Sequence, residues 1–556
     1  MPKITKTTSG GGYRLTKLLN KDIKELNGIV LSLFCVSFLI LVGLISYKVN
    51  SSYAIFTDTI EGEETIELSV GFSQDKSGAN KPLLSKNMIP VYYDEACNNN
   101  QGCWKKADKS NLNGEHKWYD YDNKIWANSV TVSSSNRDTY LNADLGTKIP
   151  MNDILTMQVW IPRYKYTVWN YNNDGTVTSE PQEIDIEFEN GITSSGEISC
   201  EDNIQGTSNG TASGTEPTTS EICKLKATTS TCTDNLCNGK TYTHPAFTFG
   251  NKELKGFWVG KFEVSSDTNC SPANYSAIGE GCNINTIRPL IKPNETSWRG
   301  AMVSIFENNI MAMNDSNNKY GFATTDDTHL IKNTEWGAIT YLSHSEYGTC
   351  SGGECVEVAL NSINTFKTGC GPQTEGSTSS GSTCNAYNTT LGQSASTTGN
   401  IYGIYDMSGG SYEYLMENIV SPDGNTMMSG NRANTSYPNY HSGYSGILYY
   451  KGTTSDGYGS YTGTYEYPDI KYYDKYSFNT SSTTRGRSKL GDAIKEVYNI
   501  SAYGWYSDYS YLARSIYPWV HRGGYYNDGS NAGVFNSYNH YGSSGTNSSS
   551  HLVISQ

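Results

Sequence analysis

An apolar run near the start of the chain is the first feature of its hydrophobic pattern. Residues 29–47, IVLSLFCVSFLILVGLISY, contain no charged side chain, and a helix of this length extends roughly 28 Å, about one hydrocarbon core. Basic residues outnumber acidic ones in residues 1–28, which indicates a cytoplasmic N-terminus. The pattern predicts one transmembrane helix, a single-pass protein of the cell membrane and an extracellular remainder. A secretory signal cleaved after Ala54 is the alternative.

The hydrophobic pattern beyond this run predicts strands and long loops. Residues 48–87 are interpreted as an extracellular stalk, and alternating Trp, Tyr and Val in residues 88–150 predict a small β-rich unit. Further strands are expected in MQVWIPRYKYTVW (157–169) and IDIEFEN (184–190). Residues 195–242 are rich in Ser, Thr, Asn and Gly and predict a loop insertion tied by disulfides.

Helical periodicity is confined to two stretches of the later half. Apolar residues return at three and four positions in residues 296–314, and a second helix is expected in TEWGAITYLSHSEYG, residues 334–348. Residues 424–486 and 501–520 are rich in Tyr, Gly and Ser and show little periodicity. Their aromatic content argues against disorder, because disordered segments are poor in aromatic residues.

Charge and tyrosine content narrow the classes of partner. The chain has 55 acidic and 41 basic residues, a net charge of −14, and no basic stripe. Nucleic acid is therefore excluded as a partner. Tyrosine is abundant, with 43 Tyr against 14 Phe, and suits both strands and contact surfaces because it combines a large apolar face with a polar tip.

The cysteines predict disulfides. Of the 13 cysteines, all but Cys35 lie beyond the apolar run, and such an even number in an exported region is typical of a disulfide framework. Zinc is the alternative, but the close pairs lack CxxC spacing and nearby histidines. The expected pairs are Cys97/Cys103, Cys270/Cys282, Cys350/Cys355 and Cys370/Cys384, with Cys200, Cys223, Cys232 and Cys237 as a cluster of open connectivity.

Five segments together resemble the formylglycine-generating enzyme (sulfatase-modifying factor) family. They are VWIPRYKYTV (159–168), LKGFWVGKFEVS (254–265), KNTEWGAITYL (332–342), GNIYGIYDMSGGSYEYL (399–415) and VHRGGYY (520–526). The resemblance implies an α+β, C-type lectin-like fold for residues 151–556, with a small twisted antiparallel sheet, few helices and long ordered loops. The chain also resembles surface proteins of gut bacteria and the variable proteins of diversity-generating retroelements, which use this fold.

The same resemblance bears on catalysis and metal binding. The family's enzymes use two cysteines that bind copper, and the matching positions here are Asp528 and Gly533. Neither can supply a thiolate, so we expect no such enzyme activity and no copper. The family's calcium turn maps to carboxylates of Asp406 and Glu413 and backbone carbonyls of Gly409 and Ser411, and calcium prefers such oxygen ligands. The alternative is a turn capped by Asp406, with Glu413 paired to a basic residue.

The polar C-terminal stretch is the candidate ligand-binding surface. HLVIS (551–555) predicts a closing strand, and residues 532–535 predict inward-facing scaffold positions. The Tyr, Asn and Ser residues that alternate with these scaffold positions are typical of binding surfaces. An AT-rich genome would give the same composition. The expected ligand-binding residues are Tyr525, Tyr526, Asn527, Asp528, Ser530, Asn531, Asn536, Tyr538, Asn539, His540 and Tyr541.

The sequence thus predicts a membrane-anchored bacterial cell-surface binding protein. Its ligand is expected to be a protein or glycan on a host, a phage or a neighbouring cell. In one version of this hypothesis, a retroelement diversifies the binding surface. Two alternatives remain. One is an altered formylglycine-generating oxidase, and the other is a structural envelope protein whose Tyr-rich face packs against the cell wall or itself.

Overall fold

A computed structural model of the chain divides into two compact units, residues 1–74 and 75–556. All residues that the structure describes lie in the second unit. The described residues are 75–111, 114–170, 180–200, 225–226, 238–268, 270–274, 282–420, 450–451, 464–465, 469–477, 488–498, 502–513, 517, 519–540 and 542–556.

The prediction of a membrane-spanning helix, and of a cell-membrane location with it, is corrected by the structure. Within the described ranges no helix combines the length and the apolar character needed to cross a bilayer. The longest of the described helices, α6 (Asn333–Ser343), has 11 residues, about half of the ~20 that a span requires. The predicted segment 29–47 and the site after Ala54 lie outside the described residues.

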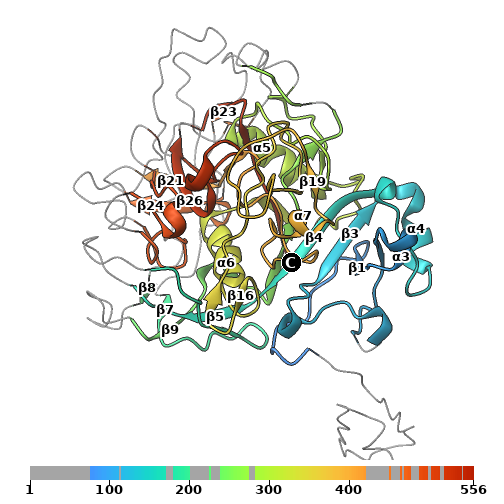
Figure 1. The fold of residues 1–556 in the computed structure, drawn as a ribbon, viewed down its shortest axis with the longest axis horizontal. Helices are drawn as coiled ribbons and strands as arrows, with labels where there is room; N and C mark the ends of the chain where they lie inside the picture. Colours follow the sequence, from blue (N-terminus) through green and yellow to red (C-terminus); the bar gives the residue numbers. More distant parts are fainter. Residues whose placement is uncertain are drawn as a thin grey trace, which may run out of the picture. The chain divides into compact units, whose positions relative to one another are not determined.

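The largest sheet has seven strands, and all of its pairings are antiparallel. Strands on both sides of residue 150 belong to it, and β1, β3 and β4 lie side by side (Figure 1). The predicted boundary at residue 150 therefore falls within one continuous sheet. In spatial order the strands are β15 (Asp327–Leu330), β28 (Leu552–Ser555), β12 (Gly256–Gly260), β4 (Ile154–Pro162), β3 (Asn128–Val132), β1 (Ile89–Asp94) and β2 (Cys103–Lys106).

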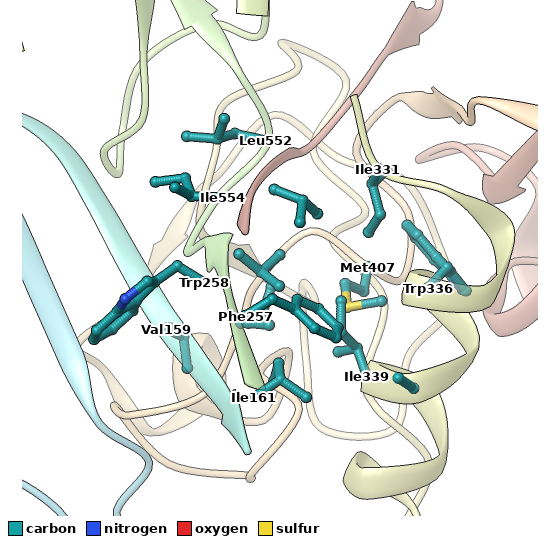
Figure 2. Packing of buried hydrophobic residues seen from close by; sticks show 14 of the residues in the cluster. Val159, Ile161, Phe257, Trp258, Ile331, Trp336, Ile339, Met407, Leu552 and Ile554 are labelled. Carbon is teal, nitrogen blue, oxygen red and sulfur yellow. The ribbon is translucent and has the colours of Figure 1, made fainter. Parts of the chain in front are cut away.

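The core lies against the centre of this sheet. Every residue of β12 and β28 is buried, which fits strands covered on both faces. Trp336 and Ile339 of α6 lie toward Phe257 and Met407 in the packed interior (Figure 2). Gly337 allows α6 to approach the chain closely, because a Cβ there would lie 1.9 Å from the carbonyl oxygen of Gly491.

Smaller sheets and a few helices complete the described part of the chain, and the mixture agrees with the expected α+β class. The four-stranded sheet contains β26 (Gly533–His540), β25 (Trp519–Gly523), β20 (Tyr412–Tyr414) and β27 (Ser548–Ser549), in this order. The three-stranded sheet contains β6 (Ile186–Phe188), β5 (Tyr164–Thr167) and β9 (Thr241–Thr243). The two-stranded sheets are β7 (Ser199–Cys200) with β8 (Leu225–Lys226), β10 (Thr248–Phe249) with β11 (Lys252–Glu253), β13 (Ser265–Ser266) with β14 (Pro289–Leu290), β16 (Cys350–Ser351) with β17 (Glu354–Cys355), β18 (Cys370–Gly371) with β19 (Asn385–Ala386), β21 (Glu417–Val420) with β24 (Asp474–Ser477) and β22 (Tyr450–Lys451) with β23 (Thr464–Tyr465). The other α-helices are α3 (Cys97–Asn100), α4 (Ser134–Asn142), α5 (Val303–Met311) and α7 (Thr390–Gln393).

The strands and helices predicted between residues 157 and 348 are confirmed with altered bounds. Residues 157–169 contain most of β4 and all of β5, and residues 184–190 contain β6. The helix expected over 296–314 begins only at Val303. Gly300 explains the shorter helix, because its φ of +83° is incompatible with a right-handed helix.

Three of the predicted disulfides are confirmed: Cys97–Cys103, Cys350–Cys355 and Cys370–Cys384. Cys270 and Cys282 are buried and do not form the expected disulfide. A hydrogen bond with Cys282 is the main reason why the pKa of the Cys270 thiol is lowered to about 7. The side chains of the 200–237 cluster lie outside the described residues.

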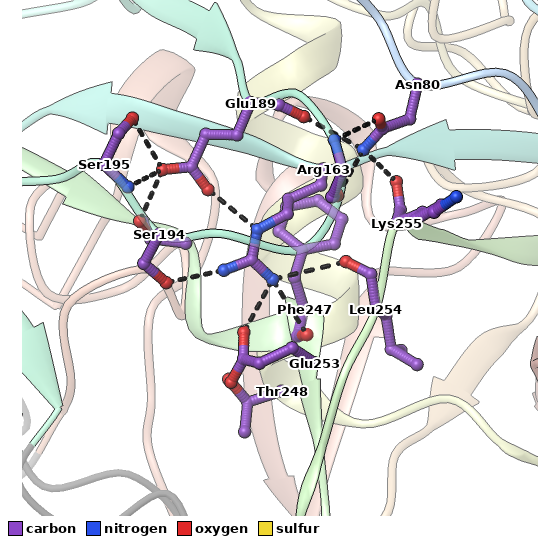
Figure 3. A network of polar contacts seen from close by, with 12 residues as sticks. Asn80, Arg163, Glu189, Ser194, Ser195, Phe247, Thr248, Glu253, Leu254 and Lys255 are labelled. Carbon is purple, nitrogen blue, oxygen red and sulfur yellow. Dashed lines mark hydrogen bonds and ion pairs between the residues drawn. The ribbon is translucent and has the colours of Figure 1, made fainter.

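A buried guanidinium joins the large sheet to the three-stranded sheet. Arg163 follows β4 directly and is fully buried. Its Nε donates to Glu189 Oε2 at 2.8 Å, and its Nη2 donates to the Ser194 hydroxyl at 2.6 Å. Its Nη1 lies 2.7 Å from Glu253 Oε2 and also donates to the carbonyl of Leu254 (Figure 3). The donors of one side chain thus hold together the segments around residues 163, 189–194 and 253–254.

Replacing this guanidinium tests its contribution to stability. We expect Arg163→Met to lower the free energy of unfolding by about 3–5 kcal/mol, because Glu189 would remain buried without its cation. The control Lys165→Met removes a pair whose partner, Glu187, is 72% exposed, and should cost less than about 1 kcal/mol. Urea unfolding followed by tryptophan fluorescence measures both. Equal losses in the two variants would contradict this role of Arg163.

Candidate functional site

The C-terminal segment is built into two sheets. β25 pairs with β26 and with β20, β27 pairs with β20, and β28 lies between β12 and β15. Gly523 and Gly524 end β25 with φ values of +79° and +71°, a backbone conformation that favours glycine. A Cβ on Gly524 would lie 2.6 Å from the Cβ of Ala532. The prediction that residues 551–555 form a closing strand is confirmed.

Hydrogen bonds fix the start of the polar stretch. The N–H of Gly409 donates to the carbonyl of Gly523 at 3.0 Å, and the N–H of Tyr526 donates to the carbonyl of Gly410 at 3.0 Å. The fully buried Arg522 donates from Nη1 to Asn333 Oδ1 at 3.0 Å. Ala532, Val534 and Phe535 are buried, as predicted for scaffold positions.

Tyrosine rings from three segments meet on this part of the domain. We call this group the tyrosine cluster, and it consists of Tyr412, Tyr503, Tyr509, Tyr511, Tyr525 and Tyr538. The centroid of Tyr412 lies 4.9 Å from that of Tyr525 and 6.3 Å from that of Tyr538. Tyr511 lies 5.7 Å from Tyr538. Contacts at such distances stabilise aromatic pairs and hold the rings in place.

The structure separates the predicted ligand-binding residues into three groups. Tyr538 is 40% exposed, and Asn527 and Ser530 are also exposed. Asn536 and Asn539 are buried, and their amides donate to the carbonyls of Asn531 and Leu512, so these two hold the scaffold and do not face outward as expected. The half-buried residues are Tyr525, Tyr526, Asp528, Asn531 and His540, and Tyr541 lies outside the described residues.

Three members of the tyrosine cluster precede the C-terminal stretch in loop 502–513, and sequence reasoning did not identify them. Tyr511 is 36% exposed, and Tyr503 and Tyr509 stack at 5.5 Å. The available signal was the spacing of tyrosines in YGWYSDYSY (503–511). That spacing does not show which distant strand the loop contacts, so only the fold identifies the cluster.

A neutral histidine and a partly buried carboxyl group lie beneath and beside the tyrosine cluster. His521 is buried, and its ring stacks on His540 at 4.3 Å. Burial, and secondarily His540, lowers the pKa of His521 well below its usual range, so its ring is neutral at pH 7. Asp528 has a raised pKa because it is partly buried, and a hydrogen bond from Tyr412 acts in the opposite direction. The cluster therefore offers mainly aromatic surface and hydroxyl groups.

The buried carboxyl group of Asp508 holds loop 502–513 against β26. Asp508 Oδ2 accepts from the N–H of Phe535 at 3.0 Å. Burial, followed by the charge of Glu357, raises the pKa of Asp508 well above its usual range. A Cβ on Gly533 would lie 2.2 Å from Asp508 Oδ2. A side chain at this position, to which the resemblance assigns one of the enzyme cysteines, therefore does not fit the present packing.

The predicted calcium residues lie in a buried acidic region. Asp406 accepts from Asn361 Nδ2 and from the N–H of Gly369, both at 2.8 Å. Glu413 Oε2 contacts His551 Nδ1, whereas Glu413 Oε1 has no hydrogen-bond partner within the described part of the chain. Burial and the charge of Asp406 raise the pKa of Glu413. Among the described residues, the basic partner of Glu413 is His551, and no Lys or Arg pairs with it as the non-metal interpretation expects.

Gly409 and Ser411 belong to the same turn. Gly409 has a φ of +79°, and the N–H of Ser411 donates to the buried Glu263 at 2.7 Å. Glu263 is a third carboxyl, and burial followed by Glu413 and Asp406 raises its pKa. Where side chains are described, ligand atoms of three His, Cys, Asp or Glu residues converge within 4.8 Å in two groups, neither of them in this turn: His344 with Cys350 and Cys355, and Asp75 with Asp120 and Asp122. The former contains a disulfide, and Lys117 pairs with Asp120 in the latter.

The carboxyl pair beside loop 502–513 predicts a pH dependence. Burial raises the pKa of Glu357 to about 7, so the folded state binds more protons than the unfolded state above pH ~4.3. Protonation of Glu357 therefore stabilises the folded state fully below that pH. This contribution is lost as the pH rises to about 7, and the free energy of unfolding falls by up to roughly 3 kcal/mol. Glu357→Gln should flatten this slope, and the control Glu354→Gln, at an exposed position, should not. The free energy of unfolding, measured from pH 4.5 to 8, gives this slope for each protein. An unchanged slope in Glu357→Gln would refute the raised pKa of Glu357.

Comparisons with known proteins do not assign the chain to a family. The resemblance to the formylglycine-generating enzyme family therefore stays an expectation based on the five segments, and the site has to be judged on its own geometry. No protein-family model matches the chain, and no curated protein matches it either.

Proposed function

We propose that this chain is a non-catalytic binding protein that captures a protein or glycan ligand on the tyrosine cluster. In this proposal, the second unit, residues 75–556, contains a formylglycine-generating-enzyme-like domain with a C-type lectin-like fold. The observation that carries the proposal is the convergence of six tyrosine rings on strands and a loop that are themselves fixed. A surface that is ordered before binding loses little entropy when a ligand arrives.

The composition of the tyrosine cluster also supports binding. Tyrosine presents a large contact area with only two side-chain torsions, and hydroxyl tips and nearby amides supply adaptable hydrogen bonds. Tyr511 and Tyr538 are among the few large hydrophobic side chains that are exposed in the described part of the chain. Their clustering with Tyr509 distinguishes this area from single exposed apolar residues, which need no explanation.

Removing two rings of the tyrosine cluster tests this function. The purified chain is screened on a glycan array and against a displayed peptide library, and the best binder serves as the probe. We expect Tyr525→Ala with Tyr538→Ala to weaken binding of this probe by about fivefold or more per residue, since such rings cost over ~1 kcal/mol at hot spots. The control Tyr92→Ala with Tyr140→Ala removes rings outside the cluster. Equal affinities for all three proteins, with unchanged circular dichroism, would reject the tyrosine cluster as the binding surface.

We also propose a structural calcium ion at the 406–413 turn. The orphaned Glu413 Oε1 and the three buried carboxyl groups fit a cation, because buried charges are normally paired or bound to metals. Asp406 and Glu413 would supply carboxylate oxygens, and Gly409 and Ser411 would supply carbonyl oxygens. The ion would hold this turn against β25, to which Gly409 is hydrogen-bonded.

Chelation tests the calcium proposal. A chelator should lower the melting temperature of the natural protein, because an ion at ~100 times its Kd contributes about 2.7 kcal/mol. Glu413→Gln should abolish this calcium-dependent difference. The control Glu496→Gln changes another buried glutamate, one that accepts from Tyr166 and Tyr341, and should retain the difference. Identical melting of the natural protein with calcium and with chelator would refute the ion.

A further inference from the structure

A second loop meets the polar C-terminal stretch beside the tyrosine cluster. Residues 373–383, QTEGSTSSGST, form this loop, which we call the serine loop, and the Cys370–Cys384 disulfide closes it. The hydroxyl of Ser380 donates to Asn527 Oδ1 at 3.1 Å, and both residues are exposed. The serine loop therefore borders the proposed binding surface, although no residue of it was expected to bind a ligand.

The base of the serine loop is fixed by hydrogen bonds. The N–H of Gly381 donates to the carbonyl of Ser362 at 3.0 Å, and the carbonyl of Gly381 accepts from the N–H of Asn364 at 2.8 Å. Gln373 donates from its amide to the carbonyl of Thr383 at 2.9 Å and so joins the two ends of the loop. Most other residues of the loop are exposed. The loop thus presents its hydroxyl groups from a held backbone, which lowers the entropy cost of binding.

Phe366 extends the row of aromatic rings from the tyrosine cluster toward the serine loop. Its ring centroid lies 4.9 Å from that of Tyr526, which in turn lies 5.1 Å from that of Tyr525. The φ of Phe366 is +54°, an outlier for a bulky residue. The guanidinium of Arg299 lies 3.8 Å from the centroid of the Phe366 ring, and the N–H of Ser297 donates to the Phe366 carbonyl at 2.9 Å. Such strained residues persist where their surroundings impose them, and they gather at functional sites.

The orientation of the outer rings bears on the class of ligand. The planes of Tyr511 and Tyr538 meet at 74°, those of Tyr525 and Tyr526 at 73°, and those of Tyr526 and Phe366 at 88°. A sugar chain stacks on aromatic faces that lie in one plane, whereas rings turned in this way present edges and hydroxyl groups. Edges and hydroxyl groups of tyrosine complement the irregular surface of a polypeptide.

The other ring pairs of the tyrosine cluster are more nearly parallel, but they cover the faces of one another. Tyr412 lies at 24° to Tyr538 and at 32° to Tyr525, and Tyr503 lies at 30° to Tyr509. Tyr412, Tyr503 and Tyr509 are also half-buried. A face that already contacts a neighbouring ring does not offer a stacking surface to a sugar.

The size and charge of the combined surface suit a protein partner. The tyrosine cluster, Phe366, residues 525–531 and the serine loop together comprise roughly 25 residues, and one side of a standard protein interface contributes about 20–30. Within residues 525–531 and the serine loop, the charged residues are Glu375 and Asp528. A neutral or basic segment complements these acidic groups, whereas an acidic one is repelled.

We propose that the serine loop and the tyrosine cluster form one surface, and that this surface binds a neutral or basic polypeptide segment of a protein partner. The tyrosine rings supply the apolar contact, and the hydroxyl groups of the serine loop bond to main-chain groups of the partner. The proposal rests on the binding function proposed above and narrows its ligand from a protein or glycan to a protein.

A bulky substitution in the serine loop tests this surface. The probe is the best binder from the screen of the glycan array and the displayed peptide library, and we expect it to be a peptide. Ser379→Arg in the full chain should weaken its binding at least about tenfold, because a long cationic side chain at this exposed position blocks the approach of a neutral or basic segment. The control Ser351→Arg changes an exposed serine in the turn closed by the Cys350–Cys355 disulfide and should bind like the natural protein. Biolayer interferometry measures the affinities.

Two results would overturn the inference, both judged on variants with native circular dichroism. One is a best binder that is a glycan, and the other is unchanged affinity for a peptide probe in Ser379→Arg. If Tyr525→Ala with Tyr538→Ala still weakens binding in these cases, the function of the tyrosine cluster stands and only the serine loop and the ligand class are lost. If the double variant also binds like the natural protein, the proposed function fails as well.

Discussion

The insertion of the last strand into the middle of the largest sheet is the constraint on which the described structure depends. β28 pairs on one side with β12, through Val553 and Ile554, and on the other side with β15. A strand with two hydrogen-bonded neighbours and two covered faces cannot leave without exposing its backbone groups and apolar side chains. The chain from β25 to β28 is thereby fixed at both ends. The polar residues between β25 and β28 form part of an ordered surface because both of these strands are held in sheets. Their composition alone would not make the surface ordered.

Buried polar groups provide order where regular structure is sparse. Lys261 donates to the carbonyls of Ile401 and Gly403 at 2.7 Å, and Arg522 donates to Asn333 and to the carbonyl of Asp492. Each of these cations satisfies loop carbonyls that have no strand partner, and breaking such contacts leaves a buried charge unpaired. Long loops can therefore be rigid without periodicity, and they can carry the tyrosine cluster.

Sequence patterns predicted the elements that are set by local periodicity and short spacing. β4, β5, β6, α6, β28 and three disulfides followed from alternation, helical spacing or close cysteine pairs. The start of α5 was missed because a left-handed Gly300 overrides the apolar spacing. The outward positions in β26 were only partly predicted, because Asn536, Tyr538 and Asn539 are all polar and the pattern does not distinguish buried from exposed. Tyr412 and loop 502–513 join the site through tertiary contacts that no local signal encodes. The membrane helix was predicted from hydropathy alone, and the described part of the chain holds no helix of that kind.

Amide hydrogen exchange of the full chain, resolved by residue, tests the clamped C-terminal segment most directly. The account predicts that amides of β25, β26 and β28 exchange as slowly as those of β4 and β12, because all of them open only with the sheets. Amides in the turn 525–531 should exchange at an intermediate rate. Exchange of residues 519–556 at the rate of an unstructured peptide, while β4 and β12 stay protected, would contradict it.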